Sequence, residues 1–229
     1  MSDFAWAFVL TIGLFLLFMV LQKKTKIALL NPLLLSSIFI IIFLLLTKIE
    51  YERYQKATSF ITFLIAPATV SLAVPLYENL GLLKKHYKTI LLTLLISVVF
   101  HALVVGSIAI ILKASDVLVA TMLPKSVTSA IAIDISRALG GIENLTVAIV
   151  VITGNLGVII APYLFKYFKI DNAIAQGLAL GSVAHAVGTS KAAELGSVEA
   201  SMATLSLIIT GVLTVLLANP LYQLIITFL

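Results

Sequence analysis

Apolar runs long enough to cross a lipid bilayer recur along the whole chain, and no other feature of the sequence limits the fold so strongly. Eight such runs lie at about residues 4–22, 31–48, 59–80, 89–112, 117–138, 143–165, 172–193 and 200–228. Backbone polar groups inside lipid must be satisfied within the protein, so these runs must be helices. Hydrophobic residues make up 61% of the 229 residues and charged residues only 11%, which excludes a soluble globular domain. We therefore predict an all-α, polytopic integral membrane protein.

Three of these runs are interrupted by small and polar residues together with helix breakers. The interruptions lie at Met122–Ala132, Gly181–Lys191 and Ala66–Pro75. Two of them contain prolines, which remove a backbone donor and disfavour helix at the preceding residue. Non-helical backbone at membrane depth must be enclosed by protein or must line a wet cavity. The pattern predicts discontinuous or re-entrant helices, as in a transporter and unlike a simple anchor.

The first interruption contains the residues that we expect to bind a ligand: Pro124, Lys125, Ser126, Thr128 and Ser129. A lysine at bilayer depth costs about 2.5–3.5 kcal/mol on insertion scales, so it needs a partner or a cavity. After Pro124 the chain can restart as a helix whose N-terminal backbone donors favour negative charge. Lysine, hydroxyls and a helix N-terminus together suit a carboxylate. In the alternative interpretation this stretch is an ordinary loop, with the ammonium in water.

The second interruption offers His185, Gly188, Thr189 and Ser190 as further binding residues. The histidine could donate to a carboxylate or carry a coupled proton, because its unperturbed pKa of about 6.5 is near physiological pH. It could equally make a helix-to-helix hydrogen bond. The glycines could simply permit close helix packing, since Gly177 and Gly181 have the small-xxx-small spacing.

Two other positions complete the predicted site. Thr69 lies between Pro67 and Pro75, where the chain forms either a discontinuous helix or a proline kink. Asn155 is an uncharged polar residue in the middle of the run at 143–165, and it either lines a pore or joins two helices.

The net charge of +5 comes largely from short connecting loops. Lys23–Lys26 and Lys84–Lys88 read as cytoplasmic loops under the positive-inside rule, so nucleic acid is not an expected partner. If every run crossed fully, Lys166 and Lys169 would lie outside, against the rule. That conflict disappears if the run at 117–138 is a re-entrant hairpin.

Catalytic motifs are absent from the sequence. There is no cysteine, no phosphate-binding glycine loop, no paired-histidine metal signature and no nucleophile elbow. Asp134 and Arg137, three residues apart, are interpreted as a local ion pair at a membrane boundary. We expect a protein that is not an enzyme and holds no cofactor or metal.

The order of the segments suggests a duplication. An interrupted segment followed by a long apolar helix occurs once at Pro67–Gly81 and again at Ser182–Gly196. Interrupted segments in corresponding positions of two halves point to a transporter binding site. The chain is interpreted as a single transmembrane domain, 1–229, with possible repeats 1–113 and 114–229.

Four motifs together resemble the LrgB/CidB family over nearly the whole chain. They are Leu123–Ala132, the pair Gly140-Gly141, Ala184–Ser190 and Pro67–Tyr77. The sequence departs from the family pattern in two places: Ser129-Ala130 stands where Thr-Pro is common, and Ser190 stands where alanine is common.

The resemblance implies a multi-pass protein of the bacterial cytoplasmic membrane that acts as a holin-like or antiholin-like regulator of murein hydrolase activity and autolysis. It implies a small LrgA/CidA-type membrane partner, and we also expect a homo-oligomer. It further implies transport, because plastid relatives carry glycolate and glycerate and bacterial members are linked to pyruvate. Two hypotheses follow: a transporter or facilitator of a small carboxylate, or a pore component or regulator without a defined substrate.

Overall fold

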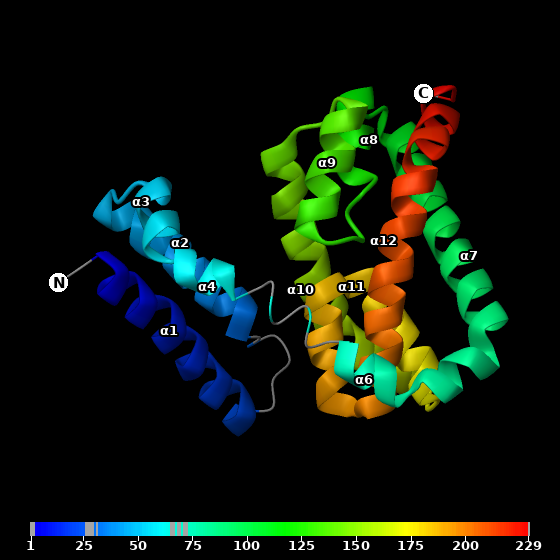
Figure 1. The fold of residues 1–229 in the computed structure, drawn as a ribbon. Coiled ribbons are helices and arrows are strands. Elements are labelled where there is room, and N and C mark those ends of the chain that lie inside the picture. The colour runs from blue at the N-terminus through cyan, green and yellow to red at the C-terminus, as the bar shows by residue number, and fades with distance from the viewer. Residues whose placement is uncertain are drawn as a thin grey trace. The chain divides into compact units, whose positions relative to one another are not determined.

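The computed structural model describes residues 3–25, 30, 32–64, 67, 70 and 73–228. Regular structure in these ranges is helical, and they contain no β-strand, which confirms the predicted all-α class. The helices form two compact units, one within Met1–Ser71 and one within Leu72–Leu229 (Figure 1).

The N-terminal unit contains α1 (Asp3–Thr25), α2 (Pro32–Thr47), α3 (Tyr51–Ala57) and α4 (Ser59–Phe63). Aromatic side chains join its helices. Trp6 packs against Phe43 and Tyr54, each with ring centroids 6.2 Å apart. The Thr11 and Tyr54 hydroxyl oxygens are 2.7 Å apart, within hydrogen-bonding distance, and tie α1 to α3.

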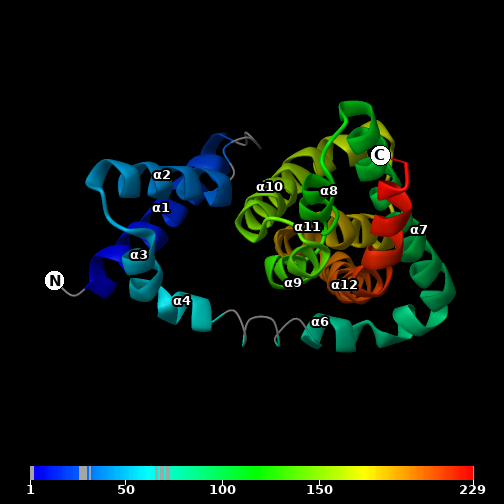
Figure 2. The same cartoon turned by 90° about the horizontal axis from the view of Figure 1, so that it is seen from above.

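The C-terminal unit holds the two interrupted regions that the sequence predicts to bind a ligand. Its elements are α6 (Ala73–Glu78), α7 (Leu80–Leu112), α8 (Asp116–Met122), α9 (Ser129–Leu139), α10 (Glu143–Tyr167), α11 (Ala173–Leu195) and α12 (Ser197–Ile226). Seen from above, α7, α8, α9, α10 and α12 surround α11 (Figure 2).

Four of the described helices are long and apolar enough to cross a membrane. They are Phe4–Thr25, Lys84–Leu112, Glu143–Tyr167 and Ser197–Ile226. The apolar α2 is shorter, with 16 residues. Of the other predicted runs, 117–138 and 172–193 contain breaks, and 59–80 contains only short helices among its described residues.

The run at 117–138 is a hairpin, here called the first hairpin. Its arms are α8 and α9, and its tip at residues 123–128 is not helical. Thr146 Oγ1 of α10 lies 3.1 Å from the Thr121 carbonyl oxygen and 2.7 Å from Ser136 Oγ. A continuous helix would separate Thr121 from Ser136 by about 22 Å. The chain therefore reverses at the tip, and both arms lie against the start of α10.

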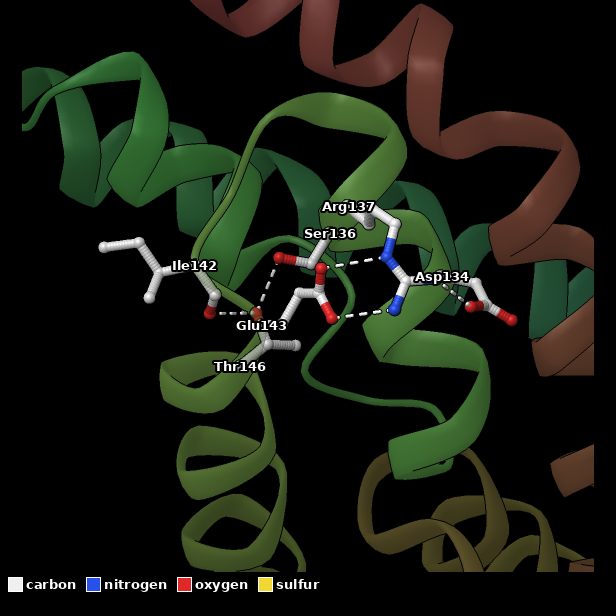
Figure 3. Close-up of polar contacts among 6 residues, drawn as sticks. All are labelled: Asp134, Ser136, Arg137, Ile142, Glu143 and Thr146. Carbon is white, nitrogen blue, oxygen red and sulfur yellow. Dashed lines mark hydrogen bonds and ion pairs between the residues drawn. The ribbon is translucent and has the colours of Figure 1, made fainter.

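A polar cluster holds this hairpin to α10 (Figure 3). Arg137 Nε and Nη2 donate to the two carboxylate oxygens of Glu143 at 2.8 and 2.7 Å. Its Nη1 donates to Asp134 at 3.1 Å, which confirms the predicted local ion pair. These side chains are exposed, whereas Ser136 and Thr146 beneath them are fully buried. Each exposed ion pair contributes little to stability. The buried hydroxyls fix the register of α8 and α9 against α10.

The run at 172–193 is a second hairpin, formed by α11. Its backbone reverses at His185, which has φ 42° and ψ −128°. In a continuous helix Leu180 and Gly188 would lie about 12 Å apart. Here a Cβ atom on Gly188 would collide with the carbonyl oxygen of Leu180, so the two arms pack directly against each other. Gln176 and Lys191, from opposite arms, line the same surface hollow.

The two hairpins enter the C-terminal unit from opposite ends. The base of the first lies at the C-terminal end of α7, where Ala109 shares an apolar cluster with Val119 and Leu139. The base of the second lies at the other end of α7, where His86 lines a groove with Asn172. Because the first hairpin returns to the end from which it enters, α10 runs back to the end of the unit at which α7 begins (Figure 1). Lys166, near the end of α10, and Lys84, near the start of α7, therefore belong to the same end of the unit.

Candidate functional site

The tips of the two hairpins meet around a small cavity, here called the tip cavity. Leu123, Lys125 and Ser126 come from the first hairpin, and Ser182 and Val183 from the second. The remaining walls belong to α7 and α12: Ser97, Val98, His101, Ala102, Thr210, Thr214, Ala218 and Leu221. The cavity volume is about 70 Å³. A single water occupies about 10–15 Å³ on this measure, so the cavity has room for a solute of only a few heavy atoms.

Among the residues that the structure describes, Lys125 is the only charged side chain in the wall of the tip cavity. Its ammonium makes no ion pair or hydrogen bond with the described part of the chain, and it also borders a second hollow between α10 and α11. Neither hollow has an aspartate or glutamate in its described wall. A half-buried cation without a carboxylate partner favours binding of an anion.

His101 of α7 fixes the first hairpin tip beside this lysine. Its Nε2 is 3.3 Å from the Leu123 carbonyl oxygen, and its Nδ1 is 3.2 Å from Ser126 Oγ. A neutral ring protonated at Nε2 can donate to the carbonyl and accept from the serine hydroxyl at the same time. The histidine thereby positions the chain segment that carries Lys125.

Thr210 of α12 lines the same cavity and carries an unpaired, buried polar atom. Its side chain is 2% exposed, and its Oγ1 has no hydrogen-bond partner among the described residues. Leaving a buried hydroxyl unpaired costs about 1–3 kcal/mol, so such atoms call for an explanation. A ligand with a second polar group beside its carboxylate would satisfy this hydroxyl.

Thr210 allows a test in which stability and ligand binding change in opposite directions. Thr210→Val removes the unpaired hydroxyl with little change in shape, so we expect the ligand-free protein to be stabilised by about 1–3 kcal/mol. Carboxylate affinity should fall about threefold to tenfold. Thermal unfolding in detergent and ligand titration measure the two effects. Thr214→Val, whose hydroxyl donates to the Thr210 carbonyl oxygen at 2.7 Å, should not stabilise the protein; a stabilisation equal to that of Thr210→Val would contradict the assignment.

The structure places the residues predicted from the first interruption at the hairpin tip, although only some line the cavity. Lys125 and Ser126 do. Pro124 is fully buried behind them. Thr128 is the N-cap of α9 and Ser129 its first residue, and neither borders the tip cavity.

The residues predicted from the second interruption lie at and after the reversal of the second hairpin. His185 is 4% exposed and its Nε2 is 3.1 Å from the Val150 carbonyl oxygen, so its ring contacts α10 and does not border the tip cavity. The Thr189 hydroxyl donates to the His185 carbonyl oxygen at 3.0 Å. Gly188 packs against the first arm, and Ser190 is exposed. The positive φ of His185 costs about 1–3 kcal/mol of conformational energy for a residue with a Cβ, and these contacts hold the backbone in that conformation.

The two remaining predicted residues lie elsewhere. Asn155 of α10 is 4% exposed, and its Nδ2 donates to the Val151 carbonyl oxygen at 2.9 Å. Its Oδ1 has no partner within the described residues, and the residue does not border the tip cavity. Thr69 lies outside the described residues.

Sequence reasoning missed Ser97 and His101 of α7, Ser182 of α11, and Thr210 and Thr214 of α12. A signal for most of them existed in the spacing of polar residues along otherwise apolar runs. Thr89, Thr93, Ser97 and His101 recur every four residues, as do Ser206, Thr210 and Thr214. Residues four apart lie on one face of a helix, so both rows could have been recognised as faces turned away from lipid.

Comparison with known proteins agrees with these observations. A sequence profile of the LrgB-like family matches residues 11–224. The uncharacterized protein YwbG of Bacillus subtilis (strain 168) is 36% identical over 184 residues, which cover 80% of this chain and 82% of that protein. No solved structure matches the chain. The match covers almost all of the sequence and confirms the resemblance that the motifs indicate: the chain is a membrane protein and belongs to the LrgB-like family.

Proposed function

We propose that this protein is a transporter or facilitator of a small monocarboxylate such as pyruvate, glycolate or glycerate, and that it is not an enzyme. One observation carries the proposal: the unpaired ammonium of Lys125 lies in a small cavity between the tips of two opposed hairpins. The cavity size limits the solute to a few heavy atoms. Ser126 and Thr210 provide hydroxyls for a second polar group, and the cationic wall selects a negative charge.

The opposed hairpins supply a route for alternating exposure of the site. Lys125 is carried by the first hairpin, which is rooted at one end of the unit, and Ser182 by the second, which is rooted at the other end. A small movement of either tip opens the cavity towards one end only. Binding at a fixed central site with movement of the surrounding elements is the general scheme of secondary transporters.

The proposed orientation follows from the lysines of the C-terminal unit. Lys84, Lys85, Lys88, Lys166 and Lys169 belong to the end at which the second hairpin is rooted, and we place that end in the cytoplasm under the positive-inside rule. The protein is then a multi-pass protein of the bacterial cytoplasmic membrane. Its eight apolar segments form two repeats, 1–113 and 114–229, each ending in a long apolar helix, α7 or α12.

Family membership favours a second candidate function. The LrgB-like family indicates a membrane protein of the holin/antiholin-like group, so the protein could instead be a pore component or regulator without a defined substrate. Carboxylate flux would also alter cytoplasmic acidity and thereby influence murein hydrolases and autolysis, so the two functions are compatible. In either function we propose homo-oligomers and an LrgA/CidA-type small membrane protein as the partner.

Reconstituted protein distinguishes the two functions. We expect proteoliposomes to take up labelled pyruvate or glycolate saturably, with inhibition by excess unlabelled monocarboxylate, while an encapsulated fluorescent dye is retained. A defined site gives saturation, whereas a pore leaks solutes regardless of charge. Dye release together with unselective flux would support the pore, and the absence of both would reject transport.

A further inference from the structure

One face of α7 carries a row of hydroxyls from its lysine-rich end to the tip cavity. Thr89, Thr93 and Ser97, here called the hydroxyl row, are spaced four residues apart, and His101 follows at the same spacing. Thr89 and Thr93 are exposed, whereas Ser97 and His101 are half-buried, so the row runs inward. Between Thr89 and Leu112 the only other polar residue is Ser107. A helix that faced lipid on all sides would have no need of such a row.

The hydroxyl row lines a groove of about 660 Å³ between α7 and the first arm of α11. Asn172 and Ser182 contribute polar groups from the facing arm, and Ile90 and Leu178 provide apolar walls. Three residues of this groove, Ser97, Ser182 and Val183, are also walls of the tip cavity. The groove and the cavity are therefore contiguous.

The hydroxyls of the row are available to water and solutes. Thr121, Thr146, Thr204 and Thr214, in other helices of the same unit, bond to a backbone carbonyl one turn earlier. In contrast, the hydroxyls of Thr89, Thr93 and Ser97 make no hydrogen bond with any described residue. Unpaired hydroxyls at the edge of a groove are expected to be hydrated or to contact a polar solute.

The other end of the tip cavity is closed by apolar packing. Leu123, Ala102 and Ala218 line the cavity and also belong to a buried cluster with Tyr222 and Ile225. A Cβ atom on Gly106 would lie 2.7 Å from Ile225 Cγ1, so α7 and α12 touch closely there. In this conformation a solute can approach Lys125 from the lysine-rich end, along the groove, but not from the opposite end.

We infer that the hydroxyl row is the access path by which a small carboxylate anion reaches Lys125 from the lysine-rich end of the C-terminal unit. The inference rests on the proposed function and assigns roles to residues outside the tip cavity. Lys84, Lys85 and Lys88 precede the row and raise the local concentration of anions at its entrance. Thr89, Thr93 and Ser97 then replace part of the hydration shell of the anion as it moves inward.

The chain has no cysteine, so single cysteines can be introduced without first removing native ones. Thr93→Cys and Ser97→Cys should react with a small, membrane-impermeant, anionic methanethiosulfonate reagent added from the lysine-rich side. Leu91→Cys and Leu95→Cys are matched controls, since these leucines are 48% and 37% exposed and lie outside the groove. Because thiolates form in water and not in lipid, the row cysteines should react at least about tenfold faster than the controls. Equal rates at all four positions would overturn the inference.

Bulky substitutions test the path in transport. Thr93→Phe narrows the groove and should reduce carboxylate flux at least about tenfold, whereas Leu91→Phe, on the opposite face, should leave flux unchanged. The labelling does not depend on transport, so the experiments can reject the proposed function and the access path independently. Fast labelling without carboxylate flux would reject the proposed function and leave an aqueous groove. Carboxylate flux with slow labelling and a fully active Thr93→Phe variant would reject the access path alone.

Discussion

Lys125→Ala is expected to reduce carboxylate uptake into proteoliposomes at least about 100-fold, because the variant removes the one charged group that the described residues contribute to the wall of the tip cavity. Lys125→Arg keeps the charge but places it differently in a cavity of about 70 Å³, so it should retain only partial activity. Lys125→Met should be inactive yet more stable to heat in detergent than the native protein, since it replaces an unpaired, half-buried ammonium with an apolar chain. This combination separates loss of binding from loss of folding.

Lys191 provides the matched control for Lys125. It also belongs to a hairpin, but its ammonium donates to Glu194 at 2.6 Å, so the charge already has a partner. Lys191→Ala should therefore leave uptake close to that of the native protein. If Lys125→Ala retains uptake within about threefold of the native value, the tip cavity is not the binding site.

Gly188→Ala should be the most damaging small substitution to the fold. The added Cβ would collide with the carbonyl oxygen of Leu180, which belongs to the first arm of the same hairpin. Gly181→Ala would likewise collide with the backbone of Ala203 in α12. Backbone atoms cannot move aside as a flexible side chain can, so we expect each variant to lose at least about 1–3 kcal/mol of stability. In a chain of this size each kcal/mol corresponds to about 2–4 °C in Tm.

Gly81→Ala is the control for this prediction, because a Cβ on Gly81 meets no atom within 4 Å. Fluorescence-detected size-exclusion chromatography after heating gives the apparent Tm of all three variants and the yield of monodisperse protein. Failure of Gly188→Ala to give folded protein agrees with the prediction. A Tm equal to that of Gly81→Ala would show that the two arms are not packed as closely as the structure places them.

The positions of the chain breaks could be predicted from the sequence, because local chemistry decides them. Pro124 cannot continue a helix, and the tip of the first hairpin lies at residues 123–128 as the interruption suggests. The small-xxx-small spacing of Gly177 and Gly181 predicts close packing, and a Cβ on Gly177 would lie 2.5 Å from the Glu199 carbonyl oxygen of α12. The run at 117–138 is a hairpin, which is the arrangement that would place Lys166 and Lys169 on the cytoplasmic side under the positive-inside rule.

The partners of the broken segments could not be predicted in the same way. His185 belongs to the second hairpin tip, yet the reversal there turns its ring towards Val150 of α10. His101 and Thr210 lie in uninterrupted, mostly apolar helices. The four-residue spacing of polar residues marks the faces that carry them, but it does not show that both faces border the tip cavity. In such helices hydrophobicity alone does not distinguish a face that meets lipid from a face that meets another helix.

The sequence by itself determined a membrane-embedded, all-helical chain with a lysine beside a helix break, because hydrophobic length and proline chemistry act within a few residues. Only the tertiary structure decided which side chains meet that lysine. Two chain reversals, from opposite ends of the C-terminal unit, place Lys125 and Ser182 in the wall of one cavity. His101 of α7, 24 residues before Lys125, and Thr210 of α12, 85 residues after it, also belong to that wall. Contacts over such separations depend on how the helices pack together, and no local pattern in the sequence encodes them.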